Sequence, residues 1–474
     1  MATRSFKWAI ILCRYRDRPA ETRPREFYED FFTQNGTGGA CDYWRAVTLN
    51  HFDLTGSRVF GWFQMNHDAA EVNTLAFPGQ RGVLVQWGRD AAAANGVSLA
   101  GFDNVLVVHN FGIDHGAAGN GVVIVHQDPA LIEMGFICHE MGHGHGLPHS
   151  FAANPDFEYG DGWDLMSFAT TTFQFDTVFQ GAAGAATVGL NARNLVALAA
   201  VPPRRMWSPA AADFSEQVVL QPLNQPPIGN RGVLVASIPP AAARPPRANN
   251  STYTVEFRRR TGWDRAITRD AVLVHETRAN TLSYLPTMWL NLTVGDQFVT
   301  PAPRVWIRVT AIDAAADTAT TRIWDAPEGS VRREDSKPKV YLIENGAKRW
   351  ITSPQALFGI GRTWADVKVV PDGGLSDIPD GPDLSLLSVR VIPHPVPVNR
   401  AVAVRFEAID GVTGAPLAGT VKKNGALIGS TNVQFSHTFK PTRKRVGLNW
   451  EITYPVVTVT VPGFAEVTVD CGFP

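Results

Sequence analysis

The chain has 474 residues and is 45% hydrophobic, so it can bury more core than one compact domain usually holds. Lys plus Arg number 43 against 44 for Asp plus Glu, which removes the electrostatic reason to expect a nucleic-acid or anionic-membrane partner. No apolar run approaches the roughly 18 to 20 residues that a membrane-spanning helix needs. A neutral or varied partner therefore fits the composition best.

The first 200 residues mix extended and helical runs. Strands are predicted at four apolar segments: Trp8–Cys13, Arg58–Phe63, Asn104–His109 and Gly121–His126. Helices are predicted at Glu26–Phe32, at Gly82–Ala94 and after Asp128, a good N-cap that is followed by Pro129. This mixture predicts an α/β domain over residues 1–203. The Gly121–His126 strand fits either an edge position, where it could pair with an extended ligand, or an internal one.

The composition changes after Val201-Pro202-Pro203, and no sustained helical periodicity follows. Apolar and polar residues alternate in three runs that predict a β-sandwich over residues 204–330: Tyr253–Phe257, Ala271–His275 and Val305–Val309. The charged run Arg258–Arg260 is interpreted as a solvated strand end.

A charged link over Arg332–Pro338 leads into a small module, so that residues 331–385 form a third predicted domain. Short strands such as Ala401–Arg405 and Val456–Val461 predict an immunoglobulin-like β-sandwich over residues 386–474. No acid-base constellation occurs there. These last domains are candidates for binding an unidentified surface ligand.

Four cysteines, too few for a disulfide scaffold in a chain of this length, stand at Cys13, Cys41, Cys138 and Cys471. No pair has C-x-x-C spacing, so histidines and carboxylates are the metal ligands to look for. Cys138 is interpreted as a small apolar group on the buried side of a helix, with a regulatory thiol as the less favoured alternative.

Residues 138–150 contain the candidate metal ligands and the candidate catalytic carboxylate. His139 and His143 are four apart, so their imidazoles share one helix face and can meet one ion. Gly146 can take a positive φ, which ends the helix and turns the chain so that His149 supplies a third nitrogen. Three protein ligands leave tetrahedral zinc one position for water, and Glu140 can take the proton of that water. His145 lies off the ligand face and is predicted to support the ligands from behind or to face solvent.

His139-Glu-x-x-His143-x-x-Gly146-x-x-His149 resembles the metzincin signature, whose remaining element is a methionine turn below the metal. Met166 follows in the segment that begins at Tyr159, and the resemblance implies that it forms an apolar floor under the ligands. Some metzincins have an assisting tyrosine two residues after this methionine. This chain has Phe168 there, so that role is not carried over.

Within the metzincins, the chain is similar to the gametolysin and immune-inhibitor-A-like bacterial peptidases over about residues 5 to 325. The likeness is carried by Phe27-Tyr-Glu-Asp-Phe-Phe32, Asp42-Tyr-Trp-Arg45, Gly61-Trp-Phe63, Tyr159-Gly-Asp-Gly-Trp-Asp164, Tyr253-Thr-Val-Glu-Phe-Arg258 and Thr261-Gly-Trp-Asp264. The resemblance implies an α/β metzincin catalytic domain followed by β-sandwich-type domains. It also implies secretion. The chain shows no signal peptide, however, which leaves unconventional export and a cytoplasmic location as alternatives.

Two further metal sites are weaker hypotheses. A second, structural zinc is considered at a glycine-rich stretch with scattered ligands: His109, Asp114, His115 and His126. Calcium (Ca2+) is considered at the acidic turn that contains Asp156, Glu158, Asp161 and Asp164, and an ordinary surface turn explains these residues equally well.

The sequence thus predicts a zinc-dependent endopeptidase with one catalytic Zn2+ and a protein or peptide substrate. Metal ligands are His139, His143 and His149, Glu140 is catalytic, and Met166 is the structural methionine. The alternative is a catalytically degenerate metal-binding protein that acts mainly as an adhesion or binding module through its C-terminal β domains.

Overall fold

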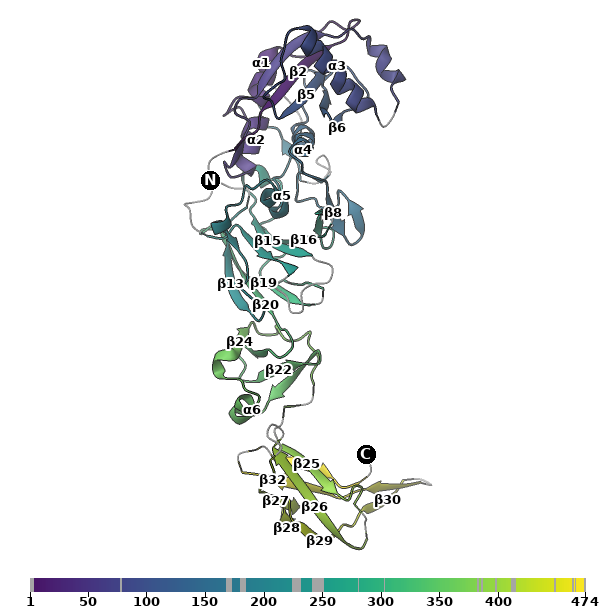
Figure 1. Ribbon diagram of the computed structural model, residues 1–474, viewed down its shortest axis with the longest axis vertical. Coiled ribbons are helices and arrows are strands. Elements are labelled where there is room, and N and C mark those ends of the chain that lie inside the picture. Colours follow the sequence, from purple (N-terminus) through teal and green to yellow (C-terminus); the bar gives the residue numbers. More distant parts are fainter. Residues whose placement is uncertain are drawn as a thin grey trace. The chain divides into compact units, whose positions relative to one another are not determined.

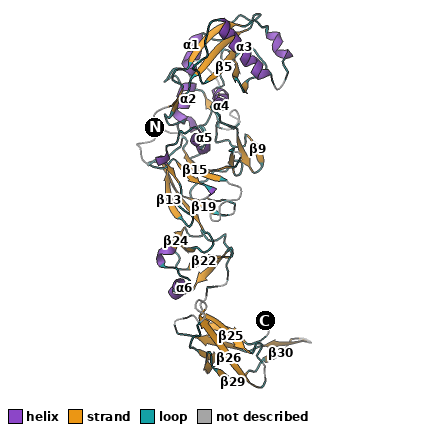
Figure 2. Cartoon of the chain, in the orientation of Figure 1, coloured by secondary structure: helices purple, strands orange, loops and turns teal. Residues whose placement is uncertain are grey.

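The structure is a computed structural model. It describes residues 4–76, 79–167, 173–179, 185–223, 232–240, 251–279, 281–301, 303–381, 383–384, 387–396, 399–410, 415–446, 449–462, 464 and 466–472. The chain divides into two compact units, one of Met1–Ala212 with Glu216–Ile323 and one of Asp213–Ser215 with Trp324–Pro474. Strands are more numerous than helices in both (Figure 1, Figure 2). These two strand-rich units confirm the predicted multidomain organisation with β-rich parts.

A five-stranded sheet with the order β4-β2-β5-β7-β6 forms the N-terminal part of the first unit. Its strands are β2 (Trp8–Arg14), β4 (Arg58–Gln64), β5 (Asn104–His109), β6 (Gly116–Ala118) and β7 (Gly121–Val125). Strands β4, β2, β5 and β7 are parallel, and β6 lies antiparallel to β7 at the edge. The predicted strand at Gly121–His126 is therefore internal, and the hypothesis that it is the edge strand is wrong.

Helices cover both faces of this sheet, and alternate residues of β2 belong to two different cores. Ile11 and its neighbours pack against α3 (Gln80–Ala94). Ile10 and Leu12 face the other core, which includes residues of α1 (Arg25–Phe32), α2 (Ala40–Val47) and α4 (Met134–Gly144). Burial on both faces explains why β2 has a continuous apolar sequence instead of an alternating one.

The predicted helices at Glu26–Phe32 and Gly82–Ala94 are confirmed, but the third helix begins at Met134, several residues after the expected start. The Asp128 carboxylate accepts a hydrogen bond from the Ala130 N–H at 2.8 Å, within a turn that does not continue as a helix. Asp128 therefore stabilises a turn and does not cap a helix, so its prediction as an N-cap is wrong.

The rest of the first unit contains two further large sheets. A seven-stranded sheet has the order β12-β14-β15-β16-β17-β8-β9, and a four-stranded sheet has the order β13-β20-β19-β18. Their strands are β8 (Ser150–Ala153), β9 (Asp156–Glu158), β12 (Met206–Trp207), β13 (Ser215–Leu220), β14 (Val235–Ile238), β15 (Thr252–Arg258), β16 (Ala271–Thr277), β17 (Ser283–Leu285), β18 (Gln297–Val299), β19 (Val305–Asp313) and β20 (Thr318–Asp325).

Strand β8 pairs in parallel with β17, so residues on both sides of the boundary predicted at residue 203 share one sheet. That boundary lies inside one compact unit, and the four-domain division stays a prediction. Smaller elements of the first unit are β1 (Arg4–Ser5), β3 (Phe52–Asp53), β10 (Phe175–Asp176), β11 (Ala185–Ala186) and α5 (Ala192–Ala197). Among its described residues, β1 with β3 and β10 with β11 also form two-stranded sheets.

The second unit contains a small four-stranded sheet, β23-β22-β21-β24, and two sheets with the orders β25-β26-β29 and β28-β27-β32-β33. The elements are β21 (Val331–Glu334), β22 (Val340–Glu344), β23 (Ala347–Ile351), α6 (Pro354–Gly359), β24 (Val367–Val370), β25 (Leu387–Ile392), β26 (Ala401–Asp410), β27 (Thr420–Lys423), β28 (Ala426–Ser430), β29 (Gln434–Thr438), β30 (Thr442–Val446), β31 (Asn449–Thr453), β32 (Val456–Thr460) and β33 (Val467–Asp470).

The charged link predicted over Arg332–Pro338 is partly wrong, because its first residues belong to β21. Arg332 is fully buried, and its guanidinium pairs with Asp213 at 2.6 Å and Asp325 at 3.1 Å. Its charge is therefore satisfied by carboxylates and not by solvent. Across the described part of the chain, no helix has the length and apolar character needed to span a membrane.

Candidate metal centre

The C-terminal half of α4 positions the first two predicted ligands, His139 and His143. After Gly144 the chain forms a Schellman-type cap, in which the Gly146 N–H donates to the His143 carbonyl at 2.9 Å and the Leu147 N–H donates to the Gly142 carbonyl at 3.0 Å. Gly146 has φ +84°, as predicted from the sequence. The cap redirects the chain and brings His149 back to the helix.

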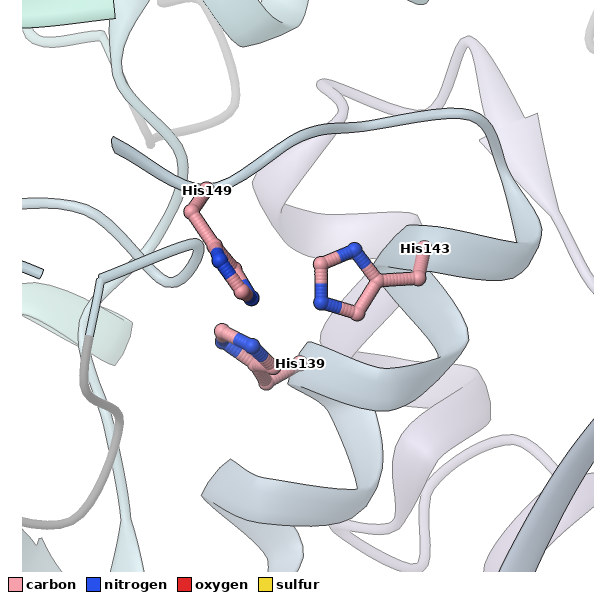
Figure 3. Close-up of side chains that lie close together, drawn as sticks. All are labelled: His139, His143 and His149. Carbon is pink, nitrogen blue, oxygen red and sulfur yellow. The ribbon is translucent and has the colours of Figure 1, made fainter. Parts of the chain in front are cut away.

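The three histidines converge on one point (Figure 3). Each offers a ligand atom, and these atoms all lie within 4.8 Å of one another. Among the described residues, no other set of three or more metal-binding side chains gathers in this way. The structure therefore brings together the three residues that the sequence singled out.

Hydrogen bonds determine which nitrogen of each ring is left for a metal. The Nδ1 atoms of His139, His143 and His149 lie 2.8, 2.9 and 2.7 Å from the Leu165 carbonyl, the Leu147 carbonyl and the Glu158 carboxylate, respectively. These acceptors require Nδ1 to carry the proton, which leaves the Nε2 lone pair as the ligand. The donor set fits zinc, because three neutral imidazoles leave one tetrahedral position for water.

Burial keeps the rings of His139 and His143 in the form that binds metal. It lowers the pKa of His139 to about 4, despite an opposing hydrogen bond to the Leu165 carbonyl, and it lowers the pKa of His143 as well. Both imidazoles are therefore neutral at pH 7, so a metal ion does not have to displace a proton from them.

Glu140 is buried beside the ligands, and its Oε2 accepts a hydrogen bond from the backbone N–H of Ala117 at 2.6 Å. Ala117 belongs to the edge strand β6, and sequence reasoning missed this contact. Burial raises the pKa of Glu140 to about 7, although the Ala117 N–H and the guanidinium of Arg81 oppose the rise. A carboxyl group with a pKa near neutrality can both accept and return a proton.

Glu140 and the three histidines line a cavity of about 710 Å³. A largely apolar cavity of about 190 Å³ adjoins it at His115, Glu133 and Phe136. A third cavity of about 380 Å³ adjoins it at Ala117 and His143. Together the three cavities, here named the groove, follow α4 from Glu133, before its first turn, to Gly144 at its end, and the second and third of these cavities also border β6.

Met166 is fully buried and lies directly against α4. A β-carbon at Gly142 would lie 2.4 Å from the Met166 Sδ, so this contact requires glycine in the helix. The Met166 carbonyl accepts a hydrogen bond from the Ser150 N–H at 2.9 Å. Phe168, which has no hydroxyl, lies outside the described residues.

Tyr159 lies in the site, although no role was predicted for it from the sequence. Its hydroxyl lies 3.2 Å from the Nε2 of His149, and its side chain lines the same cavity as Glu140. Its position in the short segment between His149 and Met166 is the sequence feature from which a role in the site could have been predicted.

A buried polar network holds the segment between His149 and Met166 against the seven-stranded sheet. Asp161 pairs with the Nε2 of His275 at 3.0 Å, and Asp164 accepts from the Ser150 hydroxyl at 2.5 Å.

Arg258 pairs with Asp264 at 2.6 Å and donates to the Trp163 carbonyl at 2.8 Å. The interpretation of Arg258–Arg260 as a solvated strand end is therefore wrong for Arg258, which is fully buried.

The residues considered for calcium occupy two different environments. Asp161 and Asp164 are buried in this network, whereas Asp156 and Glu158 are exposed on β9. The Glu158 carboxylate is bound to His149. The four carboxylates do not gather at one point.

The residues considered for a second zinc are also dispersed. His109 contacts the Leu84 carbonyl at 3.1 Å, and His126 contacts the Tyr28 hydroxyl at 2.8 Å. Asp114 pairs with Arg81 at 3.0 Å, and His115 packs on Phe136.

His145 neither supports the ligands nor faces solvent, so both parts of its prediction are wrong. Its ring packs edge-on against four aromatic rings, those of Phe6, Trp8, Trp44 and Phe52. Its two ring nitrogens are buried although the residue as a whole is only partly buried, and this burial lowers its pKa to about 3, so the imidazole is neutral.

Cys138 is fully buried, which confirms its interpretation as an apolar group, and all four cysteines, each within the described chain, are free.

Comparison with protein-family models found no match to this chain, and comparison with curated proteins found none either.

Proposed function

We propose that the chain is a zinc-dependent endopeptidase of the metzincin type. The observation that carries this proposal is that three imidazoles, each tied through Nδ1, converge on one point of a groove that also contains the Glu140 carboxylate. A merely structural zinc site would need a fourth protein ligand, and none gathers with the three histidines among the described residues.

His139, His143 and His149 would hold the metal through Nε2. When bound, zinc would act as a Lewis acid toward the scissile carbonyl and lower the pKa of water. Glu140 takes the proton of the attacking water and later returns it to the leaving amine, a task for which a carboxyl pKa near 7 is suited. The Ala117 N–H holds the carboxylate in place for both transfers.

Two features favour cleavage within a chain over removal of a terminal residue. The groove follows α4 from Glu133 to Gly144, beyond the two helical ligands in both directions along the helix, so it can accept peptide on either side of the bond to be cut. Strand β6 is at the edge of its sheet, and an extended peptide can pair with such an edge. Exposed apolar side chains at Ile113 and Leu131 line the groove and would contact the substrate.

The test measures zinc content by mass spectrometry and casein hydrolysis on the parent chain, with and without a chelator. We expect about one zinc per chain and hydrolysis that the chelator abolishes. Glu140→Gln should keep the zinc but reduce turnover by roughly 10² to 10⁴-fold. His143→Ala should lose both zinc and activity. Glu133→Gln, a matched control that removes another carboxylate from the groove, should remain active.

Undiminished hydrolysis by Glu140→Gln would refute the mechanism. Zinc binding by the parent without hydrolysis of any member of a broad peptide set would instead favour the alternative of a catalytically degenerate protein, whose C-terminal β domains would then be tested for binding.

A further inference from the structure

The backbone holds Tyr159 in an uncommon conformation. Its φ is +65°, in the left-handed region, which residues other than glycine rarely adopt. The Tyr159 N–H donates to the Ser150 carbonyl at 2.9 Å, and the Tyr159 carbonyl accepts from the Ser167 hydroxyl. Hydrogen bonds on both sides therefore maintain a conformation that aims the phenol ring into the groove.

The ring lies against two of the proposed ligands. Its centroid is 4.4 Å from that of His149 and 6.4 Å from that of His139. The Tyr159 hydroxyl lies 3.2 Å from the Nε2 of His149, and the Nδ1 of this histidine is bound by Glu158. Because Nδ1 carries the ring proton, Nε2 accepts, and the phenol O–H donates to it.

A metal and this phenol proton would compete for the same lone pair. Once Nε2 of His149 coordinates a metal, the Tyr159 O–H must direct its proton to another acceptor. The cavity beside it is the one that Glu140 lines and that would contain the scissile carbonyl. Arg81, another side-chain donor of this cavity, already binds Asp114 through Nε and Nη2.

We propose that Tyr159 is a catalytic residue: its hydroxyl moves from His149 to the carbonyl oxygen of the scissile peptide bond and donates a hydrogen bond to it. The bond strengthens as negative charge develops on that oxygen, so it lowers the barrier without adding equally to the binding of substrate. This inference rests on the proposed peptidase function.

The test compares Tyr159→Phe with the parent in the full zinc-loaded chain. Phenylalanine keeps the ring against His149 and removes only the hydroxyl. The matched control is Tyr15→Phe, because the Tyr15 hydroxyl is buried in a different core and makes no hydrogen bond within the described structure. Four quantities are measured: zinc affinity by chelator competition, kcat and KM on a peptide substrate, and affinity for a phosphinic peptide that mimics the tetrahedral state.

For Tyr159→Phe we expect kcat to fall by about 10²-fold, with KM little changed. Affinity for the phosphinic peptide should weaken in parallel, and zinc affinity should not weaken. Unchanged kcat and phosphinic-peptide affinity would overturn the inference, as would a loss of zinc affinity as large as the loss of kcat, since Tyr159 would then support only the metal. A parent chain that hydrolyses no peptide would overturn the proposed function itself, whatever the variant does.

Discussion

Each proposed ligand is oriented by a hydrogen-bond acceptor of its Nδ1, and this acceptor would not itself bind the metal. His139 and His143 are held by backbone carbonyls, of Leu165 and Leu147, so their orientation depends on the path of the chain. His149 is held by the side chain of Glu158, which is exposed and can move. Partners of this kind commonly change metal affinity by about 10 to 100-fold when they are lost.

The contact between Gly142 and Met166 gives a first prediction at the scale of single residues. In Gly142→Ala the new β-carbon would lie 2.4 Å from the Met166 Sδ, so the methionine must move. Leu165, whose carbonyl holds His139, is its neighbour and would move with it. We expect zinc affinity to fall about tenfold. Overpacking of this kind costs about 1–3 kcal/mol of stability, partly offset by about 1 kcal/mol of helix propensity.

Gly82→Ala is the matched control, because Gly82 lies in α3 and its β-carbon would lie 3.6 Å from the Asn120 Oδ1, an ordinary van der Waals contact. It should keep zinc affinity and gain up to about 1 kcal/mol of stability. Chelator competition and thermal unfolding measure both variants. Equal zinc affinity in Gly142→Ala and the parent would show that Met166 does not determine the ligand geometry.

The sequence predicts those features of the site that local spacing determines. His139 and His143 share a face because they are four residues apart in a helix, and Gly146 ends that helix with a positive φ. The Ala117 N–H and the role of Tyr159 depend on which segments meet in space, and no local pattern encodes that. His145 was misplaced because a polar residue was expected near water, whereas aromatic rings from distant segments enclose it.

At the scale of elements, the edge strand β6 was not predicted, because three residues are too few to show a period. The longer apolar run at Gly121–Val125 was considered for the edge, but β5 and β6 flank it on both sides. Two features support the proposed role of β6 in substrate binding: its outer side pairs with no described strand, and its Ala117 N–H points to Glu140.

Ala117→Pro tests this edge strand. Proline removes the N–H that donates to Glu140, and edge strands tolerate proline where the N–H points away from the neighbouring strand. We expect zinc content to be unchanged. Because a charge-assisted hydrogen bond of about 1.5–3 kcal/mol is lost, kcat should fall by roughly 10 to 100-fold.

Ala117→Gly keeps the backbone N–H and is the control, so its kcat should stay close to that of the parent. Metal analysis and steady-state kinetics separate the two effects. If the glycine variant loses as much activity as the proline variant, then kcat depends on the methyl side chain of Ala117 and not on its N–H.

At the scale of the whole molecule, the segment that carries Met166 is part of the β-rich region of the first unit. Strand β8, immediately after His149, pairs with β17, and Asp161 pairs with His275 of β16. Periodicity predicts β16 but neither β8 nor β17, which are short, and parallel pairing between segments so far apart in the chain leaves no sequence signal. We therefore expect the metal centre to depend on the stability of this sheet.

The pair of His275 and Asp161 gives a prediction for stability against pH. Burial alone would lower the pKa of His275, but the carboxylates of Asp161 and Glu256 outweigh burial and raise it to about 10. An unfolded histidine titrates near 6.5, so between about pH 6.5 and 10 the folded chain holds a proton that the unfolded chain has released. This contribution to stability is complete below about pH 6.5 and is lost as the pH rises through 10.

Calorimetric unfolding of the chelator-treated chain between pH 7 and pH 10 measures this loss, since the buried ligand His139 contributes only at lower pH. At pH 7, His275→Gln should destabilise the first unit by about 3–5 kcal/mol, the cost of leaving a buried carboxylate unpaired. The difference from the parent should narrow toward pH 10, where the parent has lost the same charge. His394→Gln, at an exposed position of the second unit, should follow the parent at every pH. A constant difference between His275→Gln and the parent across this range would mean that His275 is neutral in the folded chain and that hydrogen bonding alone joins the methionine segment to the sheet.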